Sequence, residues 1–400
     1  MTEEDEGLKI LASASAAQRI SRRAFMSGSV VVALTGGGYL LSACSKSSDT
    51  TGGTSTGAGG STGTASPVLE DQLNFFHWAQ YDDPKLFKRF TEELGPVTSI
   101  DTYNSNEQAI AKLTAAAGSS GYDIVVPTGV YIPLMVENDL LEELDLSKIP
   151  NFSNLDAAYT NQPWDPENKH SVCKDWGTTG WIVDKSQISR PINTWSDFID
   201  VAMNEASGNV SLLDAPNELA GLYFWANGID WTTEDTADLD AYEAFMVDQL
   251  APHVKTFESY PGYQFAEGNW ALSHVWNGDA RQGFNSFEDP SRYAWGLGAP
   301  VTELWMDNWT MVKGATHPEA AYAFMNFILD PANSLQDMQF HGYNTGIKGL
   351  EEAATAADTT FPDMIFFTDD QVATFRAGAV NSAFDREVEI YNKAKAAAGG

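Results

Sequence analysis

The sequence predicts an α/β protein of two lobes, each a mainly parallel sheet flanked by helices, with a ligand cleft between the lobes. Segments typical of strands and helices alternate along the chain, and this alternation starts anew near residue 177. About 330 residues follow Leu69, enough for one large or two medium hydrophobic cores. Because parallel sheets bind ligands at the carboxyl ends of their strands, the ligand site is expected in the loops there.

Residues 1–43 are expected to be a signal peptide of the twin-arginine type. Arg22 and Arg23 keep the start of this segment on the cytoplasmic side of the membrane. The uncharged stretch 27–40 that follows is too short to predict a membrane-spanning helix. We therefore expect export from the cytoplasm to the periplasm or the cell surface.

Ser42 and Ala43 precede Cys44 as in a lipoprotein processing site, where the cysteine is acylated and becomes the new N-terminus. Residues 44–68 then form a linker of mostly Ser, Thr and Gly, which cannot build a core. The mature protein is expected to be tethered to the cell membrane by lipid on Cys44. The alternative is an uncleaved anchor with an incidental cysteine, which also leaves the domain outside.

Residues 69–176 are expected to form the first part of lobe 1 with a β-α-β-α-β pattern. Asp83 and Pro84 are typical of a helix start, and Gly95 is typical of a helix end. The third strand is almost wholly apolar, as expected for a sheet covered on both faces. The elements expected in order are strand 73–78, helix 84–94, strand 97–103, helix 105–118 and strand 123–127.

Residues 177–304 are expected to form lobe 2, reached through one strand over 176–184. Its further elements are helix 195–205, strand 209–213, helices 217–228 and 239–250, and strand 272–276. The chain is then expected to return to lobe 1 over 305–372 and to end in C-terminal helices over 373–400. The elements expected there are strand 309–312 and helices 319–329, 333–340, 370–378 and 384–397.

The formal net charge of −32 lies entirely on the mature part of the chain, because residues 1–43 carry four acids and four bases. Such a field repels nucleic acids and anionic solutes and attracts cations. We therefore exclude nucleic-acid binding. An acidic surface also keeps a protein soluble in concentrated salt, and we favour this reason for most of the charge.

Cysteine and histidine usage predicts neither a disulfide framework nor a metal site. With Cys44 assigned to lipid, Cys173 has no disulfide partner within the chain and is expected to be a small buried hydrophobe. The six histidines follow no metal-ligand spacing, and no nucleophile and base are arranged for catalysis. We expect no metal, no cofactor and no enzymatic activity.

Aromatic and acidic residues recur where the predicted strands end. Aromatic faces hold an organic cation at about 0.5–2 kcal/mol each, and a buried carboxylate adds a hydrogen bond worth about 1.5–3 kcal/mol. The pattern favours a small protonated amine, although a Trp is more often a core residue and an Asp after a strand is more often a helix cap. The segments concerned are 78–81, 128–131, 214–218, 276–279 and 305–307.

Seven short stretches resemble the substrate-binding proteins of bacterial spermidine/putrescine ABC transporters, which have a periplasmic-binding-protein fold of type II. Each stretch is a weak motif, but the shared order and spacing cover almost the whole chain after the linker. The stretches are 78–81, 102–107, 122–127, 151–156, 275–278, 305–307 and 342–343. The resemblance implies a monomeric receptor that captures a polyamine and delivers it to permease subunits in the membrane.

The resemblance also implies a role for each residue of the amine site. Glu218 and Asp307 would neutralise ammonium groups, and Thr128 would offer a hydrogen bond. The aromatic walls would be Trp78, Tyr81, Trp276, Trp305 and Tyr343.

This chain departs from the family pattern at three positions of that site. Gln80 stands where the family has an acid, Val130 where it has a tyrosine, and Ala215 where it has another acid. Fewer carboxylates weaken the binding of a triamine, because an unpaired buried ammonium group is costly. A diamine such as putrescine, another small organic cation, or a neutral solute such as a sugar therefore stays open as an alternative to spermidine.

Overall fold

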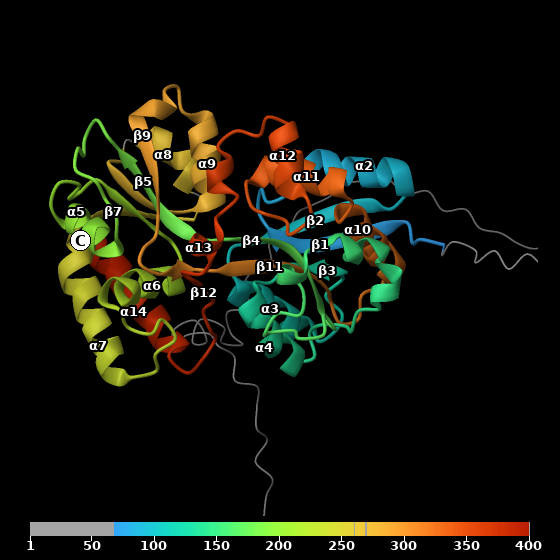
Figure 1. Ribbon diagram of the computed structural model, residues 1–400. Helices are drawn as coiled ribbons and strands as arrows, with labels where there is room; N and C mark the ends of the chain where they lie inside the picture. Colours follow the sequence, from blue (N-terminus) through green and yellow to red (C-terminus); the bar gives the residue numbers. More distant parts are fainter. Residues whose placement is uncertain (1–67, 260, 269, 400) are drawn as a thin grey trace, which may run out of the picture. The chain divides into compact units, whose positions relative to one another are not determined.

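The computed structural model describes residues 68–259, 261–268 and 270–399. The predicted signal peptide, the lipid site Cys44 and the linker up to residue 67 lie outside these residues. Within the described ranges, no helix has the length and apolar character needed to cross a membrane. The two-lobed α/β fold expected from the sequence is confirmed, and each lobe contains a five-stranded sheet (Figure 1).

The first sheet has the strand order β2-β1-β3-β11-β4. Its strands are β1 (Gln72–Trp78), β2 (Val97–Tyr103), β3 (Ile124–Val125), β4 (Ser171–Gly177) and β11 (Trp305–Met311). Strand β1 pairs in parallel with β2 and β3, whereas β11 is antiparallel to both β3 and β4. Trp78 and Thr128 therefore lie at the same edge of the sheet, where the parallel strands end.

Helices cover both faces of the first sheet, and successive residues of a strand enter different cores. In β1, Phe75 belongs to one core and Phe76 to the other, as the two-residue period of a strand requires. One core is formed with α2 (Pro84–Leu94), α10 (Pro318–Ile328), α11 (Pro331–His341) and α12 (Leu350–Ala356). The other is formed with α3 (Asn106–Ala116) and α4 (Ile132–Glu137).

The second sheet has the strand order β7-β6-β8-β5-β9. Its strands are β5 (Thr179–Asp184), β6 (Val210–Leu213), β7 (Val254–Glu258), β8 (Leu272–Trp276) and β9 (Tyr293–Leu297). Strand β6 pairs in parallel with β7 and β8, and β5 is antiparallel to β8 and β9. Trp276 is the last residue of β8, and Glu218 lies in α6, the helix that follows β6.

Two further cores lie on the faces of the second sheet. One is formed with α5 (Trp195–Met203), α6 (Pro216–Asn227), α7 (Thr236–Phe245) and the C-terminal helix α14 (Phe384–Ala398). The other is formed with α8 (Pro261–Gly268) and α9 (Asn277–Ser286). Helix α14 buries Ile390 and Ala394 in the lobe 2 core, so the chain ends on lobe 2 (Figure 1).

Two expectations about the strands were wrong. The single strand expected over 176–184 is two strands in different sheets, because β4 ends at Gly177 in lobe 1 and β5 starts at Thr179 in lobe 2. The sheets are mixed rather than mainly parallel, since each has two parallel and two antiparallel pairings. The reason is the crossing between lobes: a strand that returns must run opposite to the strand that left.

The prediction of a helix over 370–378 was also wrong. Helix α13 (Asp369–Val372) is a single turn, and Phe375 and Arg376 then form β12, which pairs in parallel with β10 (Thr302–Glu303). Phe375 is buried in the lobe 1 core, so tertiary packing decides the conformation of this segment. The sequence analysis also missed α9 and α12, as well as β7, β9 and α8.

Candidate ligand-binding site

A cavity of about 220 Å³ lies between the two lobes, at the strand ends described above. Residues from both lobes and from the strand that returns to lobe 1 line it. The structure thus brings together all eight residues that the sequence analysis assigned to a ligand site. These residues are Trp78, Tyr81, Thr128, Glu218, Trp276, Trp305, Asp307 and Tyr343.

Trp78 and Thr128 reach the cavity from the first sheet. The indole Nε1 of Trp78 donates to the carbonyl oxygen of Val126 at 3.0 Å, which fixes the ring at the strand end. Asn106, at the start of α3, accepts from the backbone N–H of Thr128 at 3.0 Å and donates to its hydroxyl oxygen at 3.1 Å. The hydroxyl hydrogen of Thr128 is therefore available to the neighbouring Asp307.

Asp307 is a buried carboxylate in β11, beside Thr128. Its Oδ2 lies 2.9 Å from the Tyr81 hydroxyl, whereas its Oδ1 has no hydrogen-bond partner among the described residues. Burial and then the charge of Asp175 raise the pKa of Asp307 to about 7, against the opposing effect of Thr128 and Tyr81. A carboxylate in this state gains strongly from a cationic partner.

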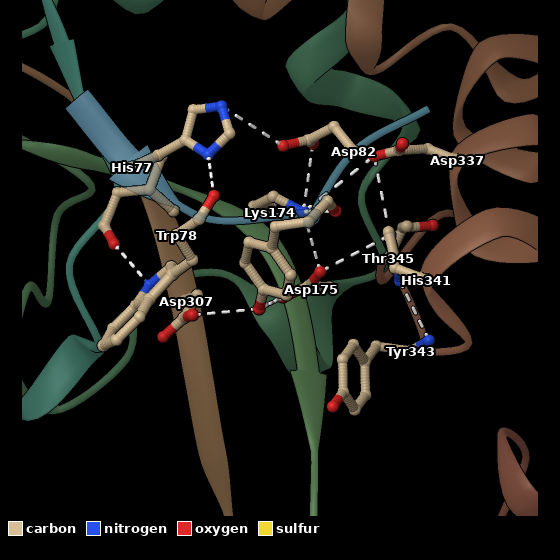
Figure 2. A network of polar contacts seen from close by, with 12 residues as sticks. His77, Trp78, Asp82, Lys174, Asp175, Asp307, Asp337, His341, Tyr343 and Thr345 are labelled. Carbon is tan, nitrogen blue, oxygen red and sulfur yellow. Dashed lines mark hydrogen bonds and ion pairs between the residues drawn. The ribbon is translucent and has the colours of Figure 1, made fainter. Parts of the chain in front are cut away.

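A buried ion network centred on Lys174 supports this side of the cavity (Figure 2). Lys174 Nζ lies 2.9 Å from Asp175 Oδ2, 3.2 Å from Asp82 Oδ1 and 3.8 Å from the centre of the Tyr81 ring. The Tyr81 hydroxyl lies 2.7 Å from Asp175 Oδ1, so it donates either to Asp175 or to Asp307. The charge of Lys174 is neutralised within the network, which leaves Asp307 without a cation of its own.

Glu218 is the buried carboxylate that lobe 2 contributes. It lies in the first turn of α6, where the helix dipole favours a negative charge. Its Oε1 accepts from the Thr179 hydroxyl at 2.8 Å and from the Trp276 indole at 2.6 Å, but its Oε2 has no hydrogen-bond partner among the described residues. His274 lies 3.7 Å from Oε2, and burial lowers its pKa to about 3, so its ring is neutral at pH 7.

Aromatic rings close the cavity around these carboxylates. Trp305 and Tyr343 meet edge to face with their ring centres 4.7 Å apart, and Tyr81 meets Tyr343 at 6.1 Å. Two glycines make room for the rings, because a Cβ on Gly177 would approach Trp305 to 2.4 Å and one on Gly278 would approach Tyr343 to 2.4 Å. The faces of such rings attract organic cations.

The sequence analysis assigned no role to three acidic residues that line the cavity, Glu107, Glu303 and Glu387, and of these Glu303 in β10 lies beside Glu218. Its side chain is buried against that of Glu218, and burial followed by the charge of Glu218 raises the pKa of Glu303 well above its usual value. A signal was present in the sequence, since Glu303, Trp305 and Asp307 alternate and alternate residues of an extended chain share one face. The alternation was hidden because the strand was expected to start only at residue 309.

Two other acids noted at the strand ends also line the cavity but differ in their pairing. Asp214 already has a cation, because Lys395 Nζ lies 2.5 Å from its Oδ1. Asp279 accepts from the Tyr343 hydroxyl at 3.3 Å, and burial raises its pKa to about 7. Asp214 is therefore a weaker candidate for a ligand contact than Glu218 or Asp307.

The three positions that depart from the family pattern all border the cavity. Gln80, Val130 and Ala215 bring no charge to it. Gln80 is exposed and has a φ of 54°, a backbone conformation that residues other than Gly rarely adopt. The carboxylates of the cavity therefore come from other positions, mainly in α6, β10 and β11.

Known proteins with a similar sequence or structure include a periplasmic binding protein and a substrate-binding protein of an ABC transporter. A curated relative, the spermidine/putrescine-binding periplasmic protein of Escherichia coli, is 30% identical over 334 residues, which cover 81% of this chain and 91% of the relative. The solved spermidine/putrescine ABC transporter substrate-binding protein PotD of Streptococcus pneumoniae superimposes with a TM-score of 0.69 at 25% identity, covering 82% of this chain and 100% of that structure. The Tp0655 (TpPotD) lipoprotein of Treponema pallidum gives a TM-score of 0.68 at 25% identity, with 82% and 99% covered.

The family model described as bacterial extracellular solute-binding protein matches residues 85–393. This match extends over both lobes and includes all but two of the eight predicted site residues, Trp78 and Tyr81. Such proteins bind solutes rather than catalyse reactions, in agreement with the sequence analysis. The chain therefore belongs to the family of bacterial extracellular solute-binding proteins.

Proposed function

We propose that this protein captures a linear polyamine of the putrescine and spermidine class and presents it to the membrane permease of an ABC importer. The observation that carries this proposal is a pair of buried carboxylate oxygens, Asp307 Oδ1 and Glu218 Oε2, without a hydrogen-bond partner among the described residues. Burying an unpaired carboxylate is costly. A protonated amine held between aromatic rings supplies the cation that each carboxylate lacks.

The positions of the two carboxylates support capture by closure of the lobes. Glu218 belongs to lobe 2, whereas Asp307 lies on the strand that returns to lobe 1. A ligand that pairs with both interacts better with a closed arrangement than with an open one, which is the requirement for a hinged receptor. The relatives named as spermidine/putrescine-binding proteins support the same class of ligand.

A neutral sugar fits the cavity less well than an amine. It would stack on the same rings but would leave Asp307 and Glu218 without a cation. Another small organic cation would satisfy one carboxylate, whereas a linear amine with a charge at each end can satisfy both. The site therefore favours a ligand with at least two ammonium groups.

A thermal-shift panel tests the proposed ligand class. Putrescine and spermidine are expected to raise the unfolding midpoint of the mature chain, because a ligand at 100 times its Kd stabilises the folded state by about 2.7 kcal/mol. The matched control is diacetylputrescine, which keeps the carbon chain but has no charge and is expected to cause no shift. A shift caused by neutral sugars and not by any amine would contradict the proposal.

We also propose that the protein is exported by the twin-arginine route and anchored to the cell membrane by lipid on Cys44. The processing-site sequence before Cys44 and the lipoprotein from Treponema pallidum support this proposal. Cys44→Ser is expected to move the protein from the membrane fraction to the soluble extracytoplasmic fraction. Cys173→Ser is the control, because Cys173 is buried in the described fold. Membrane retention of the Cys44 variant at the original level would contradict lipid anchoring.

A further inference from the structure

Glu303 is an acidic residue of the cavity to which the proposed function assigns no role. It is 6% exposed, and its carboxyl group lies against that of Glu218, which is fully buried. Two buried carboxyl groups in contact cannot both stay ionised unless a cation lies between them. A positively charged group beside this pair would therefore be strongly stabilised.

Contacts of both its backbone and its side chain fix Glu303 in this position. Strand β10 pairs with β12, and the Thr178 hydroxyl donates to the carbonyl oxygen of Glu303 at 2.7 Å. On the side chain, Asn217 Nδ2 lies 3.4 Å from Glu303 Oε1. Glu303 is thus directed at the first turn of α6, where Glu218 is held by Thr179.

No positive side chain neutralises the pair within the described part of the chain. His274 is neutral, and Arg376, the neighbour of Glu303 on β12, donates to the carbonyl oxygens of Ala373 and Phe375. The other titratable groups that face Glu303 are acids, and they comprise Asp307 on β11 and Tyr131 after β3, with Glu387 on α14 facing Tyr131. Without a ligand, the pair is expected to share one proton.

We infer that Glu218 and Glu303 form one ammonium-binding subsite, in which a protonated amine takes the place of the proton that the two carboxyl groups share. This inference rests on the proposed function. The ammonium group keeps its own protons, and the shared proton leaves to solvent. Glu218 Oε2, buried and without a hydrogen-bond partner, is the acceptor that is free for the ammonium group.

The subsite changes what the sequence implied about the ligand. The family pattern has an acid where this chain has Ala215, and Glu303 supplies a carboxyl group from β10 in its place. Glu303 and Asp307 are four residues apart on an extended segment, so their Cα atoms are at most about 13 Å apart. The cavity therefore has two acidic centres suited to a linear amine with an ammonium group at each end, and the loss of acids at Gln80 and Ala215 does not by itself favour a singly charged ligand.

Calorimetry of spermidine binding at pH 8 tests the inference. Asp307 and Asp279, each with a pKa of about 7, are largely ionised at this pH. Burial raises the pKa of Glu387, in the same cavity, to about 8, so proton release reports on the carboxyl pair once the share of Glu387 has been measured with its own variant. Titrations in two buffers with different ionisation enthalpies are expected to show on the order of one proton released per amine bound by the unmodified protein. Glu303→Gln is expected to abolish this release and to weaken binding more than tenfold at pH 8.5.

Glu387→Gln is the matched control, since Glu387 lines the same cavity on α14 but has no hydrogen bond or ion pair to either member of the pair. This variant removes any proton that Glu387 itself releases, and the release that comes from the Glu218 and Glu303 pair is expected to persist. If the unmodified protein binds amine without releasing a proton, the role of Glu303 is overturned but the proposed function is not. This outcome does not depend on whether the Glu303 variant folds. Absence of amine binding by the unmodified protein would overturn the proposed function as well, and equal proton release by Glu303→Gln would exclude the shared proton.

Discussion

Asp307→Asn is expected to weaken polyamine binding more than tenfold while leaving the fold intact. The amide has the same size as the carboxylate but no charge, so the ammonium group would be buried without its counter-ion. Removing one partner of a buried charge pair costs about 2–5 kcal/mol, and about 1.4 kcal/mol corresponds to a factor of ten in affinity. Isothermal titration with putrescine and spermidine measures the effect, and circular dichroism checks the fold.

The pH dependence of binding gives a second measure of the same residue. The free carboxyl of Asp307 has a pKa of about 7, and an ammonium group stabilises only the ionised form. The contribution of Asp307 to amine affinity is therefore expected to be present above pH 7 and to be lost as the pH decreases below 7. Asp307→Asn is expected to make this dependence shallower.

Asp139→Asn is the control for net charge. Asp139 is exposed, and its positive φ of 52° suits Asn. This variant removes one exposed charge from a residue that does not line the cavity, so the affinity is expected to stay unchanged. If Asp307→Asn binds amines as tightly as the Asp139 variant, Asp307 does not belong to the site.

Lys174→Met is expected to destabilise the protein by about 3–5 kcal/mol, which is the typical cost of breaking a buried ion pair. The side chain of Lys174 is 1% exposed, and its ammonium group lies among three carboxylates, including Asp337 at 3.9 Å (Figure 2). Met fills most of the volume but leaves these carboxylates unpaired in the interior. Urea unfolding followed by tryptophan fluorescence measures the loss.

Lys148→Met is the control for the loss of a lysine. Lys148 is 40% exposed and pairs with Glu319 at the surface, where an ion pair contributes less than about 1 kcal/mol.

The stability loss of Lys174→Met is also expected to depend on pH. Burial raises the pKa of Asp82 and of Asp337, so both carboxylates become neutral as the pH falls. A neutral carboxyl group needs no lysine partner. The loss of unfolding free energy in Lys174→Met is therefore expected to become smaller at low pH. A deficit no larger than that of Lys148→Met would show that the network does not stabilise the fold.

The network also explains how the protein keeps an acidic site without losing its structure. Lys174 neutralises the carboxylate of Asp175 directly behind the Tyr81 ring, so that charge repels Asp307 less than an unpaired one would. Asp307 itself has no lysine or arginine partner among the ion pairs of the described chain. The interior cation thus stabilises the scaffold, and the unpaired carboxylate is left for the ligand.

The sequence predicted those elements whose signals are local. Asp83, Pro84 and Gly95 predicted both ends of α2, because capping residues act within one turn. The helix expected from residue 105 is α3, and the Ser105 side chain caps its start. The aromatic and acidic residues of the cavity could be predicted because they follow strand ends, and strand ends meet at one edge of a sheet. The resemblance to a known family then assigned a role to each of them.

The amino-acid sequence by itself determined the alternation of strands and helices, the acidic character of the chain and the residue types available for an amine site. Only the tertiary structure decided that β4 and β5 belong to different lobes, that β12 replaces a helix, and that Glu303 lies against Glu218. These features depend on contacts between residues far apart in the chain, such as Glu218 with Glu303 and Lys174 with Asp82. Burial and the charge of neighbouring groups decide whether a carboxylate is paired, protonated or free for a ligand. Neither can be predicted from the residues next to it in the sequence.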